Sequence, residues 1–431
     1  MAWVYLSASR SVYAAATRCA LLFVVTLPRL AAGDWPQFRG PGGGGVSAET
    51  GLPVQWSATE NIAWKIELPG PGTSSPAIKG SRLFIASYSG FNVPGKPRGE
   101  PAQLRLHVTC LNVQDGKALW TSDVSPKLPE EEKIREGHGY ASSTPAVDDD
   151  RVYVFFGKSG VFAFDHKGKQ KWQADVGSKT SGWGSAASPV LYEKLVFINA
   201  SVESESLVAL DRETGAEKWR APGIKESWNT PVLVTLDGGK NELVVAMIQK
   251  VLGFDPKSGE QRWSCRTDIP WYMVPSIVSH GGVSYVIGGR GSGGGLAVRG
   301  GGTGDVTKTH RVWTCPKGSN VPSPVYHDGH LYWIHDVLGI AFCADAKTGT
   351  LVYEKRMDGA SDAYASAVLG DGKLYYVTRR GRTFVLAAKP EFELLATNEL
   401  GDRSTFNASP AIAGGKLFLR SDRFLYCVGG K

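Results

Sequence analysis

The segment 209–219 reads Ala-Leu-Asp-Arg-Glu-Thr-Gly-Ala-Glu-Lys-Trp, and its pattern recurs along the chain. Copies occur at 253–263 and 343–353, and looser ones at 110–120 and 165–172. The aspartate or asparagine can bond its own backbone to begin a turn, and the glycine supplies the positive φ that ends it. We interpret each copy as a hairpin between two strands, and its closing aromatic residue as an apolar plate at the seam between repeated units.

A second pattern begins each unit, with Ser or Thr, then Pro, then two apolar residues. It reads Ser-Pro-Ala-Ile at 75–78, and related copies occur at 144–147, 188–191, 230–233, 275–278, 323–325, 366–368 and 409–412. We align Ser276 and Ala367 with the proline of the other copies. After the first step the spacing is about 45 residues, which is typical of a β-propeller with four strands per blade.

The two patterns together define eight units, and the last unit, 408–428, ends after three strands. The segment 61–66, Asn-Ile-Ala-Trp-Lys-Ile, resembles a closing strand but lies before the first unit. Pairing it with the last unit would remove an open sheet edge, which otherwise invites aggregation. The sequence thus predicts an all-β fold over 61–431, an eight-bladed β-propeller of four-stranded blades whose ring is closed by an N-terminal strand.

Composition agrees with a globular chain and excludes several kinds of site. Of the 431 residues, 42% are hydrophobic and 21% are charged, an ordinary balance for a folded protein. The net charge of +7 is small for this size and the basic residues are scattered, so nucleic acid is not an expected partner. The six cysteines include no Cys-x-x-Cys pair, which excludes zinc-ribbon and thioredoxin-like sites.

The first 33 residues have the pattern of a signal peptide. Arg10 and Arg18 precede the apolar run 19–27, and Ala-Ala-Gly at 31–33 offers small residues for cleavage after Gly33. The run is too short to span a membrane. We expect export to the periplasm or the extracellular space, an N-terminal arm over 34–60, and a solvated loop at the charged insertion 126–136.

Several motifs resemble a known family. They are the Asp-x-x-Thr-Gly-x-x-x-Trp hairpin, Asp-Trp-Pro-Gln-Phe-Arg-Gly-Pro at 34–41, and the segments 137–145 and 226–231. Over residues 34–430 the chain resembles the secreted bacterial PQQ-binding-like β-propeller repeat proteins, named after pyrroloquinoline quinone (PQQ). The resemblance implies the propeller fold. The class includes both quinoprotein alcohol dehydrogenases and a non-enzymatic outer-membrane assembly lipoprotein, so the resemblance leaves the function open.

The chain departs from the dehydrogenases of that class. Those enzymes commonly stack the quinone on a disulfide between adjacent cysteines, but in this chain no two cysteines are adjacent. The chain also contains no Cys-x-x-Cys-His motif for covalent haem. Both departures argue against a bound quinone, and we expect no cofactor.

A functional site is expected at one mouth of the central channel. In a four-stranded blade, the loop before the inner strand and the loop after the second strand lie on the same face, where aromatic and ionisable residues gather. The predicted ligand-binding mouth consists of His138, Tyr140, Trp183, Glu226, Trp228, Asn229, Trp271, Tyr272, Arg290, Asn320, Asp336, Tyr364, Arg379 and Phe406.

Some of these residues have a second interpretation. The three tryptophans, Trp183, Trp228 and Trp271, could simply plug the channel, because tryptophan is usually buried. Acidic residues of the same loops, such as Glu203 and Asp362, could bind Ca²⁺, although we expect a solvated acidic rim. No metal is therefore assigned.

We expect a monomeric, non-catalytic binding or scaffold module of the cell envelope, with a protein, small molecule or glycan at the mouth. The alternative is a quinoprotein-type dehydrogenase that binds PQQ and Ca²⁺ there. In that alternative Glu226 or Asp362 would abstract the alcohol proton, and Arg290 or Arg379 would lie near the quinone oxygens. Stacked aromatic rings would also suit the flat faces of sugars.

Overall fold

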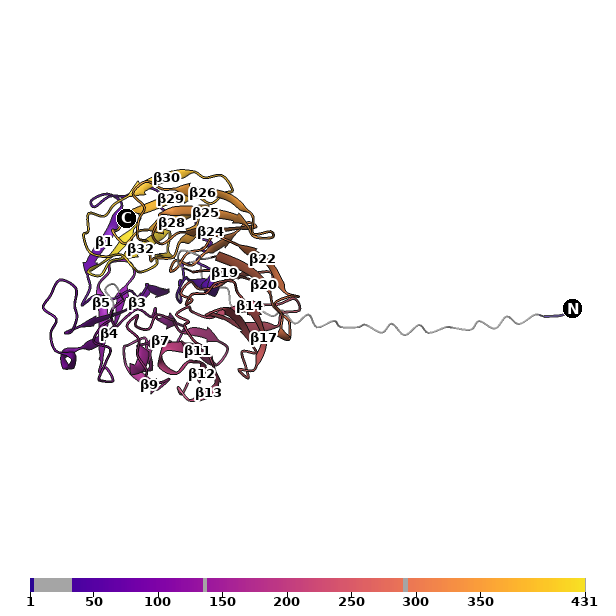
Figure 1. Cartoon of the computed structure of the whole chain (residues 1–431), viewed down its shortest axis with the longest axis horizontal. Helices are drawn as coiled ribbons and strands as arrows, with labels where there is room; N and C mark the ends of the chain where they lie inside the picture. The colour runs from indigo at the N-terminus through magenta and orange to yellow at the C-terminus, as the bar shows by residue number, and fades with distance from the viewer. Residues whose placement is uncertain (4–32, 135–137, 290–293, 431) are drawn as a thin grey trace. The chain divides into compact units, whose positions relative to one another are not determined.

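The computed structural model describes residues 1–3, 33–134, 138–289 and 294–430. Residues 33–430 contain eight antiparallel sheets arranged as a ring, with the chain passing from one sheet to the next around it (Figure 1). The predicted eight-bladed β-propeller is confirmed. The expected signal peptide lies almost entirely outside the described residues.

The strands of each blade follow one another from the channel outward. From inner to outer strand, blades 1 to 4 consist of β2 (Ala77–Lys79), β3 (Arg82–Ser89), β4 (Arg105–Asn112), β5 (Ala118–Val124); β6 (Ala146–Val147), β7 (Arg151–Phe155), β8 (Val161–Asp165), β9 (Gln170–Ala174); β10 (Val190–Tyr192), β11 (Leu195–Ala200), β12 (Ser206–Asp211), β13 (Glu217–Pro222); and β14 (Val232–Thr235), β15 (Asn241–Met247), β16 (Lys250–Phe254), β17 (Gln261–Arg266). Blades 5 to 8 consist of β18 (Val278–His280), β19 (Val283–Gly288), β20 (Gly294–Arg299), β22 (Arg311–Cys315); β23 (Val325–His327), β24 (His330–Ile334), β25 (Ile340–Asp345), β26 (Leu351–Arg356); β27 (Val368–Gly370), β28 (Lys373–Val377), β29 (Thr383–Ala387), β30 (Leu394–Asn398); and β31 (Ala411–Ala413), β32 (Lys416–Arg420), β33 (Phe424–Val428), β1 (Ile62–Glu67).

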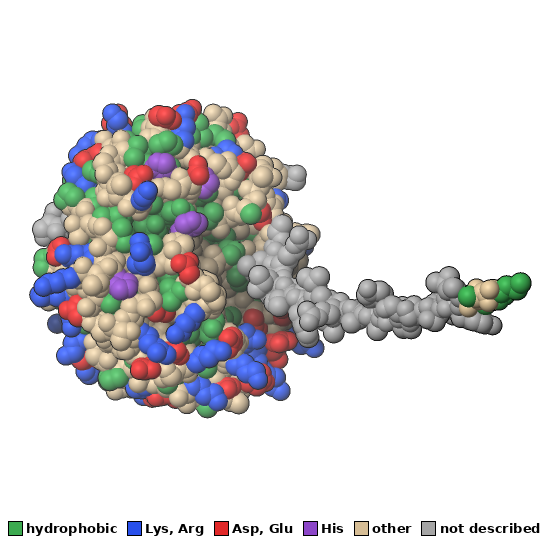
Figure 2. Space-filling model, turned by 90° about the vertical axis from the view of Figure 1, so that its right-hand side faces the viewer, with side chains coloured by type: hydrophobic (Ala, Val, Ile, Leu, Met, Phe, Trp, Pro, Cys, Tyr) green, Lys and Arg blue, Asp and Glu red, His purple; other side chains and the backbone are tan. Residues whose placement is uncertain are grey.

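Helical structure in the described residues is limited to short turns, η1 (Pro41–Gly43), η2 (Pro101–Gln103), η3 (Gly157–Ser159) and α1 (Ser201–Ser204). None of the described helices has the length and apolar character needed to cross a membrane. On the face shown in Figure 2, acidic and basic side chains are interspersed, as the scattered charges of the sequence predict.

Blade 4 departs from the four-stranded prediction. The short strand β21 (Gly304–Asp305) comes from an insertion in blade 5 and pairs in parallel with β17, adding a fifth strand. This insertion replaces the regular hairpin turn, so Trp263 of β17 has a different partner. Its Nε1 donates to Glu242 Oε2 at 2.8 Å.

The seams between blades use the aromatic residue and the glycine of the hairpin motif together. In five seams, the indole Nε1 of a tryptophan in an outer strand donates at 2.9–3.1 Å to a carbonyl in the turn of the next blade. The glycines of those turns have φ of 71–84°. A Cβ on any of them would lie only 2.5–2.8 Å from the tryptophan ring. The motif therefore needs glycine both for its turn and for close packing, and the predicted seam role of tryptophan is confirmed.

The Ser or Thr of the opening motif forms a closed hydrogen-bonded ring around the channel. In each blade the backbone N–H of this residue donates to the hydroxyl of its counterpart in the next blade, at 2.9–3.0 Å. We call this set the hydroxyl ring: Ser75, Thr144, Ser188, Thr230, Ser276, Ser323, Ser366 and Ser409. Ser276 is thus equivalent to the hydroxyl residue and not to the proline, so our alignment of that copy was wrong by one residue.

Removing one hydroxyl of the ring should be costly. Ser323→Ala leaves the Ser276 N–H buried without an acceptor, and we expect a loss of about 1–3 kcal/mol in the free energy of unfolding. Urea unfolding of the variant measures this loss. Ser279→Ala is the control. It removes a half-buried hydroxyl from the inner strand β18, outside the hydroxyl ring, and should change stability by less than about 0.5 kcal/mol.

The ring is closed by three kinds of contact between the two ends of the propeller. Strand β1 pairs antiparallel with β33 and completes blade 8, beside the C-terminal strands in Figure 1. The Ser409 N–H donates to the Ser75 hydroxyl. The Arg420 guanidinium of blade 8 is buried and donates through Nη1 to the carbonyls of Ser74 and Ala86, at 2.6 and 2.9 Å.

The N-terminal arm lies against the inner strands. Trp35 is fully buried and exchanges two backbone hydrogen bonds with Ile78 of β2, and Gly45 O accepts from the Leu369 N–H of β27. The fully buried Arg39 donates to the carbonyls of Gly44 and Pro324. Because the inner strands have a free edge toward the channel, the arm covers part of that edge and links blades that are far apart in the sequence.

Candidate functional site

The channel is lined by residues that precede the hydroxyl ring by two positions. A channel cavity of about 100 Å³ is lined by such a residue from every blade: Thr73, Ser142, Ala186, Trp228, Val274, Val321, Tyr364 and Asn407. In extended backbone, residues two apart project from the same side. The hydroxyl ring and this second layer therefore succeed one another along the channel.

A larger cavity continues from this layer at the predicted mouth. We call it the mouth cavity; it has a volume of about 230 Å³. Nine predicted residues line it: His138, Trp183, Trp228, Tyr272, Asn320, Asp336, Asp362, Tyr364 and Arg379. The structure thus brings these nine residues together around one cavity.

Aromatic rings of the mouth cavity form a continuous set of contacts. His138 stacks on Tyr364 with centroids 6.0 Å apart and meets Trp183 edge-on at 5.6 Å. Tyr272 contacts both Trp183 and Trp228, at 5.8 and 5.5 Å. Trp228 is fixed by its Nε1, which donates to Gly184 O at 2.8 Å. The rings support one another as walls, so these tryptophans line a cavity rather than plug it.

Polar groups of the mouth cavity come from blades 5 to 7. Asp336 is almost fully buried, and its Oδ1 accepts from the Asn320 N–H at 3.3 Å. The Asn320 side chain is 6% exposed, and its buried Oδ1 has no hydrogen-bond partner among the described residues. An unpaired buried amide oxygen is costly, so this atom marks a place where water, a cation or a ligand donor can bind.

The other predicted residues do not line the cavity, although the Trp271 ring contacts that of Tyr272 at its rim. Tyr140 packs on Tyr88 and Phe91, Asn229 is buried and bonds neighbouring backbone, and Phe406 stacks on Tyr426 in the core. Glu226 and Trp271 do not line the cavity; Glu226 is exposed and Trp271 is 39% exposed. Arg290 lies outside the described residues.

Sequence reasoning missed four apolar residues of the cavity wall, namely Ala186, Val274, Val321 and Val337. Three of them stand two positions before a hydroxyl-ring residue, at the position that Trp228 and Tyr364 hold in their own blades. The repeat therefore contained the signal. Small apolar side chains carry no reactive group of their own, so they do not stand out in a sequence as aromatic and ionisable ones do.

An open depression adjoins the mouth cavity and shares Asp362 and Arg379 with it. We call it the arginine hollow; it has a volume of about 480 Å³ and is lined by Asp362, Arg379, Arg380, Asp402, Arg403, Ser404 and Thr405. Blades 7 and 8 supply these residues. The hollow places three arginines beside the aromatic walls, which suits a ligand with an anionic group.

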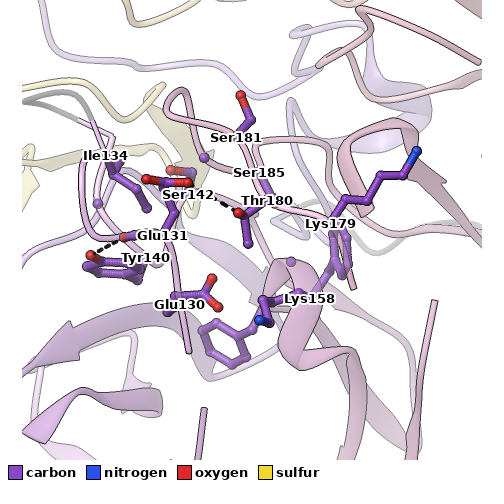
Figure 3. A pocket seen from close by; sticks show the side chains of 15 residues that line it. Glu130, Glu131, Ile134, Tyr140, Ser142, Lys158, Lys179, Thr180, Ser181 and Ser185 are labelled. Atoms are coloured by element: carbon purple, nitrogen blue, oxygen red, sulfur yellow. Dashed lines mark hydrogen bonds between the residues drawn. The ribbon is translucent and has the colours of Figure 1, made fainter. Parts of the chain in front are cut away.

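A small side pocket of about 20 Å³ lies next to the channel and is shown in Figure 3. The loop 126–134 covers it. Lys158 Nζ donates to Pro129 O, the Tyr140 hydroxyl donates to Glu131 O at 2.7 Å, and the Thr180 hydroxyl donates to a Glu131 carboxyl oxygen. The described part of this insertion is thus fastened to the propeller at these points, while Lys127, Leu128, Pro129, Glu132 and Lys133 are exposed to solvent as expected.

Two carboxyls in this region have raised pKa values: Glu130 lines the side pocket, and Glu203 accepts a hydrogen bond from Ser185, which lines it. Glu203 is only 2% exposed, and burial raises its pKa to about 7. The hydrogen bond that the Ser185 hydroxyl donates to its Oε1 acts in the opposite direction and lowers the pKa. Burial also raises the pKa of Glu130 to about 7, opposed by the Lys158 charge and reinforced by Glu203. Glu203 is therefore no part of a solvated rim.

Comparisons with known proteins support the fold. No curated protein matches the sequence. The structure of BamB from Moraxella catarrhalis aligns with a TM-score of 0.62 at 14% identity, covering 86% of this chain and 97% of that one. A europium-containing methanol dehydrogenase aligns at 0.65 and 11% identity, covering 93% and 98%. The quinohemoprotein alcohol dehydrogenase from Comamonas testosteroni aligns at 0.61 and 13% identity, covering 94% and 82%.

At such identities these structural neighbours establish the architecture alone, and by name they include BamB and dehydrogenases. The sequence gives the narrower result. Residues 104–355, more than half of the chain, match the profile of a single family. The chain belongs to the family described as outer membrane protein assembly factor BamB.

Proposed function

We propose that this protein is an exported, non-catalytic binding module of the cell envelope that holds a protein partner at the mouth cavity. The observation that carries the proposal is the rim of this cavity. Trp271, Val337 and Leu338 are among the few large hydrophobic side chains that are more than a third exposed, and Val337 also lines the cavity. Exposed apolar groups around a concave aromatic site are typical of protein-binding surfaces.

The placement of the carboxylates also favours binding over catalysis. A general base must lie within hydrogen-bond reach of the proton that it removes. Glu226 does not line the cavity, and Asp362 is exposed where the cavity opens into the arginine hollow. Neither group is held in a shielded position beside the aromatic walls. The family's name, an outer-membrane assembly factor, agrees with an envelope role.

One observation favours the second candidate, a quinoprotein-type dehydrogenase that binds PQQ and Ca²⁺. Asn320 and Asp336 both line the mouth cavity, the Asn320 Oδ1 has no partner among the described residues, and Ca²⁺ prefers such oxygen ligands. With Asp362 these residues could supply part of a calcium shell, and Trp183 and Trp228 could flank a flat ring. Bound PQQ would supply the redox chemistry, and Arg379 would carry the positive charge nearest to it.

Site-specific photo-crosslinking in cells that make the protein tests the proposal. A benzoylphenylalanine in place of Val337 should give a discrete adduct with one envelope protein, whereas the same residue in place of Val312, exposed on outer strand β22, should not. Filling the cavity with Ala186→Trp should abolish the adduct. Equal labelling from both positions, or an adduct that survives Ala186→Trp, would contradict the proposal.

Titration with PQQ separates the two candidates. A ligand that binds only the folded state must raise the melting temperature by mass action. A saturable rise that requires Ca²⁺ and is lost in Asp336→Asn would favour the dehydrogenase. An unchanged melting temperature at a large excess of PQQ and Ca²⁺ leaves the binding module as the function that the cavity supports.

A further inference from the structure

The arginine hollow contains one guanidinium with a fixed orientation. Arg379 Nε donates to Asn407 Oδ1 at 3.0 Å, and the Arg379 Cζ lies 4.5 Å from the centroid of the Tyr364 ring. These contacts set the plane of the guanidinium. Its two Nη groups have no hydrogen-bond partner among the described residues. A guanidinium held in this way presents a planar fork that matches the two oxygens of a carboxylate.

The charges around this fork leave the hollow positive. Arg380 and Arg403 are exposed and have no ion-pair partner in the described part of the chain. Of the two carboxyls that line the hollow, Asp402 accepts hydrogen bonds from three side-chain hydroxyls, which hold it in place. Asp362 is the other. Three arginines against two carboxylates give the lining of the hollow a net charge of about +1. Behind the lining, Asp422 also faces Arg379, and the buried Arg420 offsets its charge.

The mouth cavity indicates which ligand group lies next to the anionic group in the hollow. Its volume of about 230 Å³ is the share of liquid occupied by roughly eight water molecules, which leaves room for an aromatic side chain. Arg379 and Asp362 line both spaces, so a ligand group in the hollow is adjacent to one in the cavity. The exposed rim at Trp271, Val337 and Leu338 adds apolar surface beyond what a small acid would cover.

We propose that the mouth recognises a carboxylate next to an aromatic side chain on its protein partner, with the carboxylate in the arginine hollow and the ring in the mouth cavity. This inference rests on the proposed binding function and specifies the partner's chemistry. The carboxylate can come from an acidic side chain or from the C-terminus of the partner. The two sources share one chemistry, and matched probes separate them.

Two matched pairs of small probes test the inference by ligand-observed NMR and calorimetry. N-acetyltryptophan and its amide differ only in a terminal carboxylate, and N-acetyl-Trp-Glu-amide and N-acetyl-Trp-Gln-amide differ only in a side-chain carboxylate. We expect the acidic member of at least one pair to bind about five- to tenfold more tightly, as one charge-assisted contact allows. The pair that shows the preference identifies the source of the carboxylate. The preference should shrink as salt is added.

Substitutions on the surface locate the preference. Arg379→Gln removes the guanidinium fork and should abolish most of the preference for the acid, whereas Arg380→Gln combined with Arg403→Gln removes the two other charges of the hollow and should weaken it. Arg382→Gln is the control, because Arg382 pairs with Glu399 and does not line the hollow. An unchanged melting temperature of the double variant, whose two arginines are exposed, shows that its fold is intact.

The outcomes separate this inference from the proposed function. Equal affinity within both pairs, no binding by any probe at millimolar concentration, or a preference that persists undiminished in Arg379→Gln would each overturn the carboxylate assignment. Crosslinking from Val337 detects a partner whatever its charge. If the carboxylate assignment fails but the crosslink forms, the proposed binding function is retained. Loss of the crosslink would remove the module itself.

Discussion

Trp64→Ala should lower the free energy of unfolding by about 3–5 kcal/mol, which is the usual cost of removing a buried tryptophan. Trp64 belongs to β1, the strand that completes blade 8, and its ring packs against Gly116 in the turn of blade 1. Its Nε1 donates to Val113 O at 2.9 Å, and its ring contacts Phe418 of β32. One side chain thus joins the first and last blades.

Two other tryptophans serve as controls for this prediction, measured by urea unfolding and hydrogen exchange. Trp219→Ala removes the same contact from an internal seam, so it should cost a similar free energy without opening the ring. Only Trp64→Ala should accelerate amide exchange along both β1 and β33. Trp271→Ala, at a half-exposed position, should cost less than about 1 kcal/mol. A loss for Trp64→Ala no larger than that would contradict the closure role.

The fold could be predicted because the same physical requirement occurs in almost every blade. A tryptophan that docks on a glycine turn, and a hydroxyl that accepts a neighbour's N–H, impose residue types at fixed spacing. The missing strand of blade 8 was found by the same logic. The prediction fails where a blade departs from this pattern. Ser276 was aligned one residue off, although it belongs to the hydroxyl ring. Trp263 bonds the Glu242 carboxylate instead of a carbonyl in the next hairpin turn.

The site could be predicted only as far as strand order reaches. Topology places residues at the mouth, but it does not determine which of them point into the channel. Asn229 and Phe406 follow the same rule of position as Trp228, yet they lie in the core, because neighbouring side chains along extended backbone project in opposite directions. The arginine hollow likewise depends on contacts such as Arg379 with Asn407, which no periodicity reveals.

Glu203 illustrates why burial within loops escapes sequence reasoning. It belongs to a polar segment after a strand, which predicts exposure. In the structure α1 directs it inward, against Ser185, under the fastened loop 126–134. The segments around Glu203 come from other blades and from an insertion whose charged residues predict exposure to solvent. Its measurable consequence is a dependence of stability on pH.

Glu203→Gln should make the protein more stable above neutral pH, by on the order of 2–3 kcal/mol. Burial raises the Glu203 pKa from 4.5 to about 7, so the folded state favours the protonated carboxyl. Its contribution to stability is full below pH 4.5, where both states are protonated, and is lost as the pH rises toward 7. Each unit of difference between the folded and unfolded pKa is worth about 1.4 kcal/mol. Glutamine stays neutral and keeps an oxygen for the Ser185 hydroxyl, so the variant avoids this loss.

Urea unfolding of both proteins between pH 4 and pH 9 measures the effect. The two stabilities should nearly coincide at pH 4 and should diverge between pH 5 and pH 7.5, with the variant higher. Glu205→Gln is the control two residues away. Lys179 and Lys225 lower the Glu205 pKa, so this change should remove a favourable interaction at neutral pH and give no gain. Parallel curves for wild type and Glu203→Gln would show that the Glu203 carboxyl is not shielded. A divergence of the expected sign would show that the Glu203 carboxyl stays protonated in its buried position against Ser185.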